Sequence, residues 1–447
     1  MARRSRAELA EYKRAPSGDT GRVLMSVPRP ATGDLAASAS RAEPESAYAW
    51  TRLFVALTLS ATGGVGMWSV IVALPAVQAE FGVARSAATL PYTATMICFG
   101  LGAILTGRLS DRVGIMRPVV AGAVSLGVGY ALASQATTLW QFILTQGLIV
   151  GVAGSVTFAP LVADTSLWFT RRRGIAVAII ASGSYLAGTI WPPVVQYFIQ
   201  AQGWRRTYVG IAIFCVVTML PLSLVLRRRS PLTGTVTASA STGAGSWPLR
   251  PLGMSPAALQ TVLVIAGLSC CVAMSMPQVH IVAYSADLGH GAARGAQMLS
   301  LMLAGGIVSR LVSGWVCDRI GGRRTLLLGS SLQALALVLF LPFDGLASLY
   351  VVSVLFGLFQ GGIVPSYAVI IREFFPPSEA GLRVSTVLTA TVFGMALGGW
   401  MTGMIFDLTG SYQAAFVNGI LWNLLNIGIA VGLLRRPARP LEHMLSA

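Results

Sequence analysis

Charged residues are scarce in this chain. Only 11% of the 447 residues are Asp, Glu, Lys or Arg, and Lys13 is the only lysine. Ordinary soluble domains contain about 25% charged residues. The scarcity argues against a soluble enzyme, and the sequence lacks the alternation of strand and helix patterns that such an enzyme would show. It also lacks the short alternating segments of a membrane β-barrel.

Residues that bind metals or perform covalent chemistry are also few. The five cysteines lie in or beside apolar segments, and the adjacent Cys270 and Cys271 cannot form a C-x-x-C metal site. No HExxH motif, paired intramembrane aspartates or Ser/His/Asp set is found. We therefore expect no enzyme activity, no cofactor and no metal.

Long apolar runs fill most of the chain, which is 54% hydrophobic. Their length predicts membrane-spanning helices, and hence an all-α membrane protein embedded in the lipid bilayer. The twelve predicted spans are residues 53–79, 87–107, 117–135, 138–163, 174–199, 207–226, 256–284, 295–316, 324–341, 346–371, 382–405 and 412–434. We expect a disordered cytoplasmic tail at 1–50, a six-helix half at 51–226, a cytoplasmic linker at 227–254, a second six-helix half at 255–436, and a short tail at 437–447.

The distribution of basic residues predicts the orientation. With both termini inside, 27 of the 32 lysines and arginines lie at inside positions, four lie in outside loops, and Arg310 lies within a span. This asymmetry follows the positive-inside rule, and it explains the net charge of +16 without a nucleic-acid partner. We expect a multi-pass protein of the cell membrane, the inner membrane if the source is bacterial, with cytoplasmic termini.

A short motif occurs twice at matching places in the two halves. The first copy contains Gly107, Asp111 and Arg112, and the second contains Gly314, Asp318 and Arg319, at an offset of 207 residues. Glycine permits tight turns, and the aspartate can cap a helix or pair with an arginine. The motif resembles the signature loop of the major facilitator superfamily, which implies twelve helices in two halves, alternating access, and a gating role for these six residues.

Arg310 is the one basic residue in the middle of an apolar span. Placing a guanidinium in lipid costs roughly 2.5–3.5 kcal/mol on insertion scales, so such a residue usually faces a cavity on a transport pathway. A structural arginine paired with an intramembrane acid is the alternative. The sequence favours the pathway, because Asp164, Asp287, Glu373 and Asp407 all lie near span ends.

A more specific resemblance covers residues 53–434. The segment LWFTRRRGIAVAIIASGSYLAG, from Leu167 to Gly188, is similar to the loop and fifth helix of monocarboxylate porters and oxalate/formate antiporters. The position of Arg310 then matches the eighth-helix arginine that contacts the substrate carboxylate in the monocarboxylate family. A guanidinium suits this task because its planar fork binds a carboxylate through two hydrogen bonds.

Other polar side chains in the spans are candidates for the substrate site. We select His280, Tyr92, Tyr367, Ser184 and Tyr185 in addition to Arg310. His280 suits either a substrate or proton role or a simple interfacial position. Each of the others also fits an ordinary interhelical hydrogen bond.

The chain departs from the porter pattern at two places. Its first helix has no lysine, and Gly306 occupies the position of an acid that proton-linked porters carry one turn before the arginine. We predict a monomeric secondary transporter for a small organic anion, a monocarboxylate, with proton symport. Anion exchange and export of drugs or other solutes are the alternatives.

Overall fold

The computed structural model describes residues 45–228 and 251–436. Most of the predicted N-terminal tail and linker, and all of the predicted C-terminal tail, lie outside the described residues. The described chain is all α-helical in its regular elements, apart from one π-helical and one 3₁₀ segment. The all-α prediction is confirmed.

The first half of the chain contains helices that are interrupted at several points. Its elements are α2 (Ala47–Gly63), α3 (Val65–Phe81), α4 (Arg85–Val113), α5 (Met116–Ser134), α6 (Leu139–Ile143), a π-helix (Leu144–Val150), α7 (Gly151–Ser155), α8 (Ala159–Ser166), α9 (Arg173–Ala181) and α10 (Gly183–Val225). The first predicted span corresponds to α2 and α3 together, and the fourth to α6 through α8.

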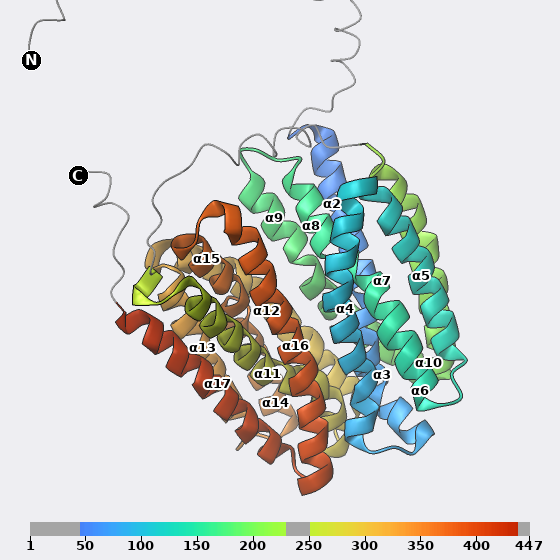
Figure 1. Cartoon of the computed structure of the whole chain (residues 1–447). Coiled ribbons are helices and arrows are strands. Elements are labelled where there is room, and N and C mark those ends of the chain that lie inside the picture. Colours follow the sequence, from blue (N-terminus) through green and yellow to red (C-terminus); the bar gives the residue numbers. More distant parts are fainter. Residues whose placement is uncertain (1–44, 229–250, 437–447) are drawn as a thin grey trace, which may run out of the picture. The chain divides into compact units, whose positions relative to one another are not determined.

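The second half contains fewer breaks. Its elements are α11 (Pro256–Asp287), α12 (Ala292–Ile320), α13 (Gly322–Leu339), α14 (Leu346–Gln360), α15 (Ile363–Phe374), α16 (Pro377–Thr409) and α17 (Tyr412–Arg435). The helices of this half lie beside those of the first half along two seams. Figure 1 shows α16 beside α4, and α12 lies against α10.

Ten stretches of the described residues are long and apolar enough to cross a membrane. The stretch from Gly174 to Val225 has 52 residues. At 1.5 Å per residue it is far longer than a bilayer core of about 30 Å, so it holds two passes. The break lies at Gly203, whose φ of 81° and ψ of 160° are not helical. The 18-residue α13, with two arginines in its first turn, supplies the twelfth pass.

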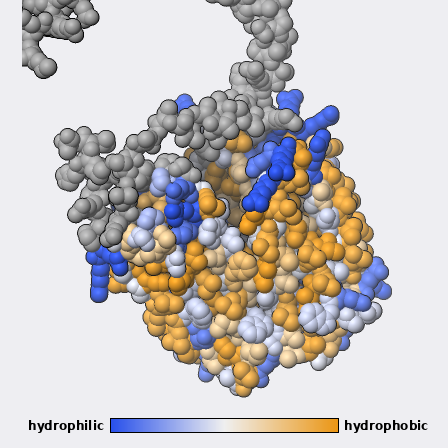
Figure 2. Space-filling view, viewed as in Figure 1, coloured by the Kyte–Doolittle hydropathy of each residue, from blue (hydrophilic) through white to orange (hydrophobic). Residues whose placement is uncertain are grey.

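The surface matches this account. Figure 2 shows apolar side chains over the flank of the described helices and hydrophilic ones gathered near the ends. Exposed leucines and isoleucines on the flank, such as Leu105 and Ile213, face the region that lipid tails would occupy.

The repeated motif has the same backbone geometry in both halves. Gly114 ends α4 with φ 81° and ψ 161°, and Gly321 ends α12 with φ 82° and ψ 161°. Each glycine N–H donates to a carbonyl four residues earlier, that of Ser110 or Cys317, at 2.9 Å. L-residues with a Cβ rarely adopt this conformation, so the two glycines terminate their helices alike.

Two predicted boundaries are corrected. The first helix begins at Ala47, inside the predicted 1–50 tail, because the Ser46 hydroxyl accepts a hydrogen bond from the N–H of Ala49 and caps it. The repeated motif is also less loop-like than predicted. Asp111 and Asp318 lie within the last helical turns of α4 and α12, and the chain turns only at Gly114 and Gly321.

Candidate functional site

The long helix α4 defines two opposite ends of the described bundle. It has 29 residues, about 43 Å at 1.5 Å per residue, with Arg85 at its first turn and Asp111 at its last. We call these the Arg85 end and the repeat-turn end. Arg310 lies on α12, ten residues before that helix ends at the repeat-turn end.

The Arg310 guanidinium contacts the other half of the chain. Its Nη1 donates to the carbonyl oxygen of Ala181 at 3.0 Å, and its Cζ lies 4.4 Å from the centroid of the Tyr185 ring. Both partners belong to the fifth span, in α9 and α10. Nε is buried and makes no hydrogen bond in the described structure. The edge formed by Nε and Nη2 therefore has no partner among the described residues.

Gly306 makes the position of the Tyr185 ring possible. A Cβ built on Gly306 would lie 2.4 Å from the ring atom Cε1, far inside van der Waals contact. Gly306 lies one helical turn before Arg310, so both residues present the same helix face to Tyr185. The aromatic ring thus fills the space that a side chain at residue 306 would take.

No carboxylate pairs with Arg310 within the described ranges. The ion pairs found there are Arg52–Asp164, Arg85–Asp287, Arg205–Glu80 and Arg383–Glu379. The alternative of a structural pair with an intramembrane acid therefore has no support in the described residues.

Ser184 lies beside the Arg310 group. Its carbonyl oxygen accepts a hydrogen bond from the Trp68 indole N–H at 3.1 Å. Both residues line a small cavity with room for about one water molecule. Tyr185 and Arg310 thus meet where α12 contacts the fifth span, and Ser184 belongs to this place as the residue before Tyr185, with its own contacts toward Trp68.

Tyr92 and His280 form a second group farther toward the Arg85 end. Both side chains are buried, and both lie against Gly399 of α16. His280 Nε2 is 2.9 Å from the carbonyl oxygen of Gly399. A Cβ added to Gly399 would lie 3.1 Å from the Tyr92 ring. The Tyr92 hydroxyl and His280 Nδ1 have no partner in the described structure. His280 is 1% exposed, so its side chain faces the protein interior rather than lipid.

Tyr367 belongs to neither group. Its hydroxyl donates to Asn426 Oδ1 at 3.0 Å, and Asn426 Nδ2 donates to Ser330 Oγ at 2.8 Å. These residues lie on α15, α17 and α13, so the tyrosine ties three helices of the second half together. The six predicted site residues therefore fall into three places rather than one.

The repeat motif residues are exposed at the repeat-turn end. Asp111, Arg112, Asp318 and Arg319 are all exposed, and no hydrogen bond or ion pair joins them to other described residues. Arg319 stacks on Trp315 of its own helix, with Cζ 3.6 Å from the ring centroid. The proposed gating contacts are therefore not made in this conformation.

Sequence reasoning missed a cluster at the Arg85 end. Arg85 donates to the Asp287 carboxylate at 2.9 Å and to the Tyr412 hydroxyl, and stacks on Phe406 with Cζ 4.7 Å from the ring centroid. The Asp407 carboxylate accepts from the backbone N–H of Arg85 at 2.8 Å. Four residues from α11, α16 and α17 thus hold the first turn of α4.

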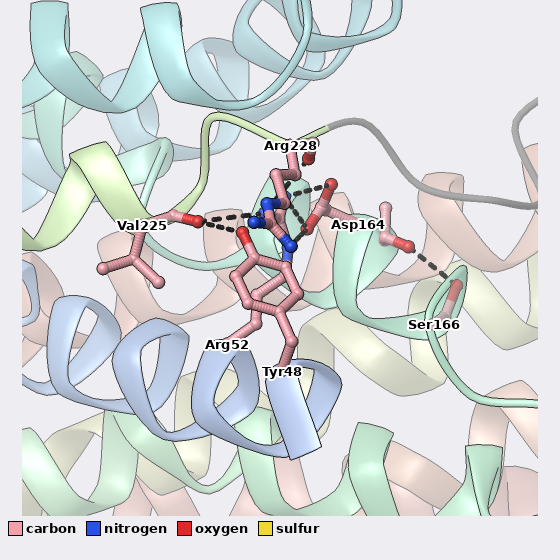
Figure 3. A network of polar contacts seen from close by, with 7 residues as sticks. Tyr48, Arg52, Asp164, Ser166, Val225 and Arg228 are labelled. Atoms are coloured by element: carbon pink, nitrogen blue, oxygen red, sulfur yellow. Dashed lines mark hydrogen bonds and ion pairs between the residues drawn. The ribbon is translucent and has the colours of Figure 1, made fainter. Parts of the chain in front are cut away.

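Sequence reasoning also missed a network of polar contacts at the start of α2, which is drawn in Figure 3. Arg52 is 2% exposed, and its guanidinium binds both carboxylate oxygens of Asp164. Arg52 also donates to the carbonyl of Arg228 at 3.2 Å, and the Tyr48 hydroxyl donates to that of Val225. The network joins the first, fourth and sixth spans within one half, so its role is structural.

Similarity to known proteins agrees with this architecture. A model of the Major Facilitator Superfamily matches residues 56–347 and 263–444. Monocarboxylate transporter 13 of Bos taurus is 27% identical over 343 residues, covering 74% of this chain and 76% of the relative. The MFS-type transporter pynF of Aspergillus niger is 25% identical over 342 residues, covering 75% of this chain and 76% of that protein.

The solved structures share the fold at low sequence identity. A bacterial homologue of the human lysosomal transporter Spinster, in an inward-facing and occupied conformation, superimposes with a TM-score of 0.69 at 14% identity, covering 88% of this chain and 98% of that one. The peptide transporter POT, as a point mutant in complex with sulfate, gives a TM-score of 0.67 at 14% identity, covering 85% and 94%. From the family match and its agreement with the twelve-pass architecture, we conclude that this chain is a membrane transporter of the Major Facilitator Superfamily, similar to monocarboxylate transporters.

Proposed function

We propose that this transporter moves a small organic monoanion, a monocarboxylate, and that Arg310 binds the carboxylate. The observation that carries the proposal is the guanidinium of Arg310, which lies between the two halves with an unused Nε–Nη2 edge and no acidic partner in the described residues. A carboxylate fits that edge through two parallel hydrogen bonds. A single guanidinium matches one carboxylate rather than two.

The proposal includes alternating access of the two six-helix halves, 51–226 and 255–436, around this site, in a monomer with cytoplasmic termini. The polar contacts described between the halves lie at the Arg85 end and near mid-span. From the distribution of basic residues along the chain, we infer that the Arg85 end is the outer one. Opening there would require the Arg85 cluster to separate. The repeat motifs, exposed at the repeat-turn end, would then make their contacts in the opposite conformation.

For coupling, proton symport is the first candidate and anion exchange the second. Symport needs a titratable group, and His280 is the histidine within a described span. Exchange is favoured by the glycine at residue 306, because no carboxylate beside Arg310 can accept a proton in place of the substrate. A carrier without bound substrate would then have to reorient with the charge of Arg310 unbalanced. Exchange avoids this step, because substrate is bound in both directions.

The test is uptake into proteoliposomes of labelled lactate, pyruvate, formate and oxalate. A monocarboxylate transporter accumulates at least one of the first three. Under symport a pH gradient drives this uptake, and under exchange an internal carboxylate drives it. Accumulation of none of them, with export of apolar dyes in an efflux-deficient host, would support the exporter alternative instead.

A further inference from the structure

The contacts of Arg310 point to a role for two neighbours that do not themselves bind substrate. We infer that Tyr185 and Gly306 form a positioning pair, in which the tyrosine ring fixes the guanidinium and the glycine makes room for the ring. The inference rests on the proposed function for its transport consequences. Its structural part, the orientation of Arg310, stands on the contacts alone.

The first step is the face-on contact. The Arg310 Cζ lies 4.4 Å from the ring centroid of Tyr185, inside the range of about 6 Å for a cation–π interaction. This contact places the cation over the face of the ring and uses none of the N–H donors of the guanidinium. The hydrogen bond from Nη1 to the Ala181 carbonyl at 3.0 Å then fixes rotation within the plane. Because Nε and Nη2 lie on the side of Cζ opposite Nη1, the Nε–Nη2 edge then faces away from the Ala181 carbonyl.

The second step is the space that the ring needs. Gly306 is the residue whose added Cβ would meet the Tyr185 ring at 2.4 and 2.6 Å, from the atoms Cε1 and Cδ1. Real Cβ atoms do not approach so closely, so alanine at residue 306 would displace the ring. Displacing the ring removes the surface on which Arg310 rests. A side chain at residue 306 and the ring of Tyr185 therefore exclude each other.

The third step is the charge. The guanidinium is held by a ring face and a backbone carbonyl, neither of which carries a full negative charge. No described carboxylate pairs with it, as the four ion pairs of the described chain all involve other arginines. The anion that binds the free edge is then the group that balances Arg310. Tyr185 thus orients the cation without neutralising it. An acidic side chain in its place would neutralise the cation.

The experiment measures the reactivity of Arg310 in the purified full-length protein. Phenylglyoxal modifies accessible guanidinium groups, and mass spectrometry reports the rate at Arg310 alone. Tyr185→Ala should raise the rate at least 5-fold by releasing the side chain, whereas Tyr185→Phe should restore most of the wild-type rate, because the ring is retained. Tyr197→Ala is the matched control, since Tyr197 is 67% exposed and lies outside the site.

The same measurement tests whether the two residues act as a unit. Gly306→Ala should raise the Arg310 rate, and the double variant Gly306→Ala/Tyr185→Ala should react no faster than Tyr185→Ala. Gly428→Ala is the control, because a Cβ there meets no atom within 4 Å. The inference would be overturned if the fold increases of the two single variants multiplied in the double variant. An unchanged modification rate at Arg310 in Tyr185→Ala would also overturn it.

A transport measurement separates this inference from the proposed function. If labelled lactate or pyruvate is carried, Tyr185→Ala should raise KM by about 10-fold or more and change the maximal rate much less, because orientation of the binding edge is lost. If the wild-type protein carries no carboxylate, the proposed function fails, while the reactivity of Arg310 still decides the positioning role. A Tyr185→Ala variant with wild-type KM for a carboxylate that is carried would contradict positioning.

Discussion

Arg85 and Asp287 form an ion pair at 2.9 Å that joins the first turn of α4 to the last residue of α11, across the two halves of the transporter. The arginine side chain is 9% exposed and the aspartate 37%. The pair is reinforced by the Tyr412 hydroxyl and by Asp407, which caps the α4 backbone. We regard this cluster as the latch that keeps the Arg85 end closed.

The first prediction concerns this latch. Arg85→Ala should favour opening at the Arg85 end by about 2 kcal/mol, between the values for exposed and buried pairs. Spin labels at Gln202 and Leu408, on exposed turns of the two halves, would report the change as a longer distance, in a background with the five cysteines replaced. Arg206→Ala, an exposed arginine without a partner among the described residues, is the control. An unchanged distance distribution in Arg85→Ala would reject the latch.

The second prediction compares the two halves. Glu80 pairs with Arg205 at 2.6 Å within the first half, and the residues 207 positions later are Asp287 and Tyr412. The second half has Tyr412 where the first half has Arg205. Asp287 therefore lacks a cation within its own half and binds Arg85 instead. Tyr412→Arg should give Asp287 a partner within its own half and place a second cation near Arg85. The label distance should therefore lengthen, as in Arg85→Ala. Tyr412→Phe should open the Arg85 end less than Tyr412→Arg, and equal effects would contradict the explanation.

The third prediction concerns stability. Arg52→Ala leaves Asp164 without its cation in a site where the arginine is 2% exposed, so it should destabilise the protein by about 3–5 kcal/mol. The i,i+4 pair Arg383–Glu379 is more exposed, and Arg383→Ala should cost about 0.5 kcal/mol. Thermal unfolding in detergent measures both. Equal losses in the two variants would show that the Arg52 network contributes no more than a surface pair.

The fourth prediction separates stability from gating in the repeated motif. Gly114→Ala and Gly321→Ala should each cost about 1–3 kcal/mol, because both glycines adopt a backbone conformation reserved for glycine. Gly107→Ala and Gly314→Ala should not lower stability and should raise it by up to about 1 kcal/mol, since both lie within helices and a Cβ at either position meets no atom within 4 Å. If Gly107 and Gly314 act in gating, their substitution should slow transport without lowering the melting temperature. Normal transport in both variants would remove them from the gate.

The sequence predicted the helices and the repeat well, because apolar runs and a 207-residue offset are visible along the chain. It also located Arg310, since a charge in an apolar span stands out. It could not show which side chain meets it, because Tyr185 lies 125 positions earlier and looks like any span tyrosine. In the sequence, Arg85 is one of the four basic residues assigned to outside loops, and Arg52 is one of the 27 at inside positions, so neither stands out.

One signal in the sequence could have revealed the latch. Aligning the halves at their offset places Asp287 opposite Glu80 and Tyr412 opposite Arg205, which leaves an acid without its expected cation. The grouping of the polar candidates had no such signal. Tyr367 and Tyr92 have similar apolar surroundings in sequence, yet one hydroxyl is bound to Asn426 and the other has no partner in the described structure.

The most direct test of the central claim is uptake by the Arg310→Lys variant in proteoliposomes. Lysine keeps the charge but offers no planar edge, so uptake of the monocarboxylate that the wild type carries should fall about 10- to 100-fold, equivalent to about 1.4–2.8 kcal/mol. Arg206→Lys, with equal protein incorporated, should transport normally. Wild-type uptake of every carboxylate by Arg310→Lys would contradict the assignment of Arg310 as the substrate-binding residue.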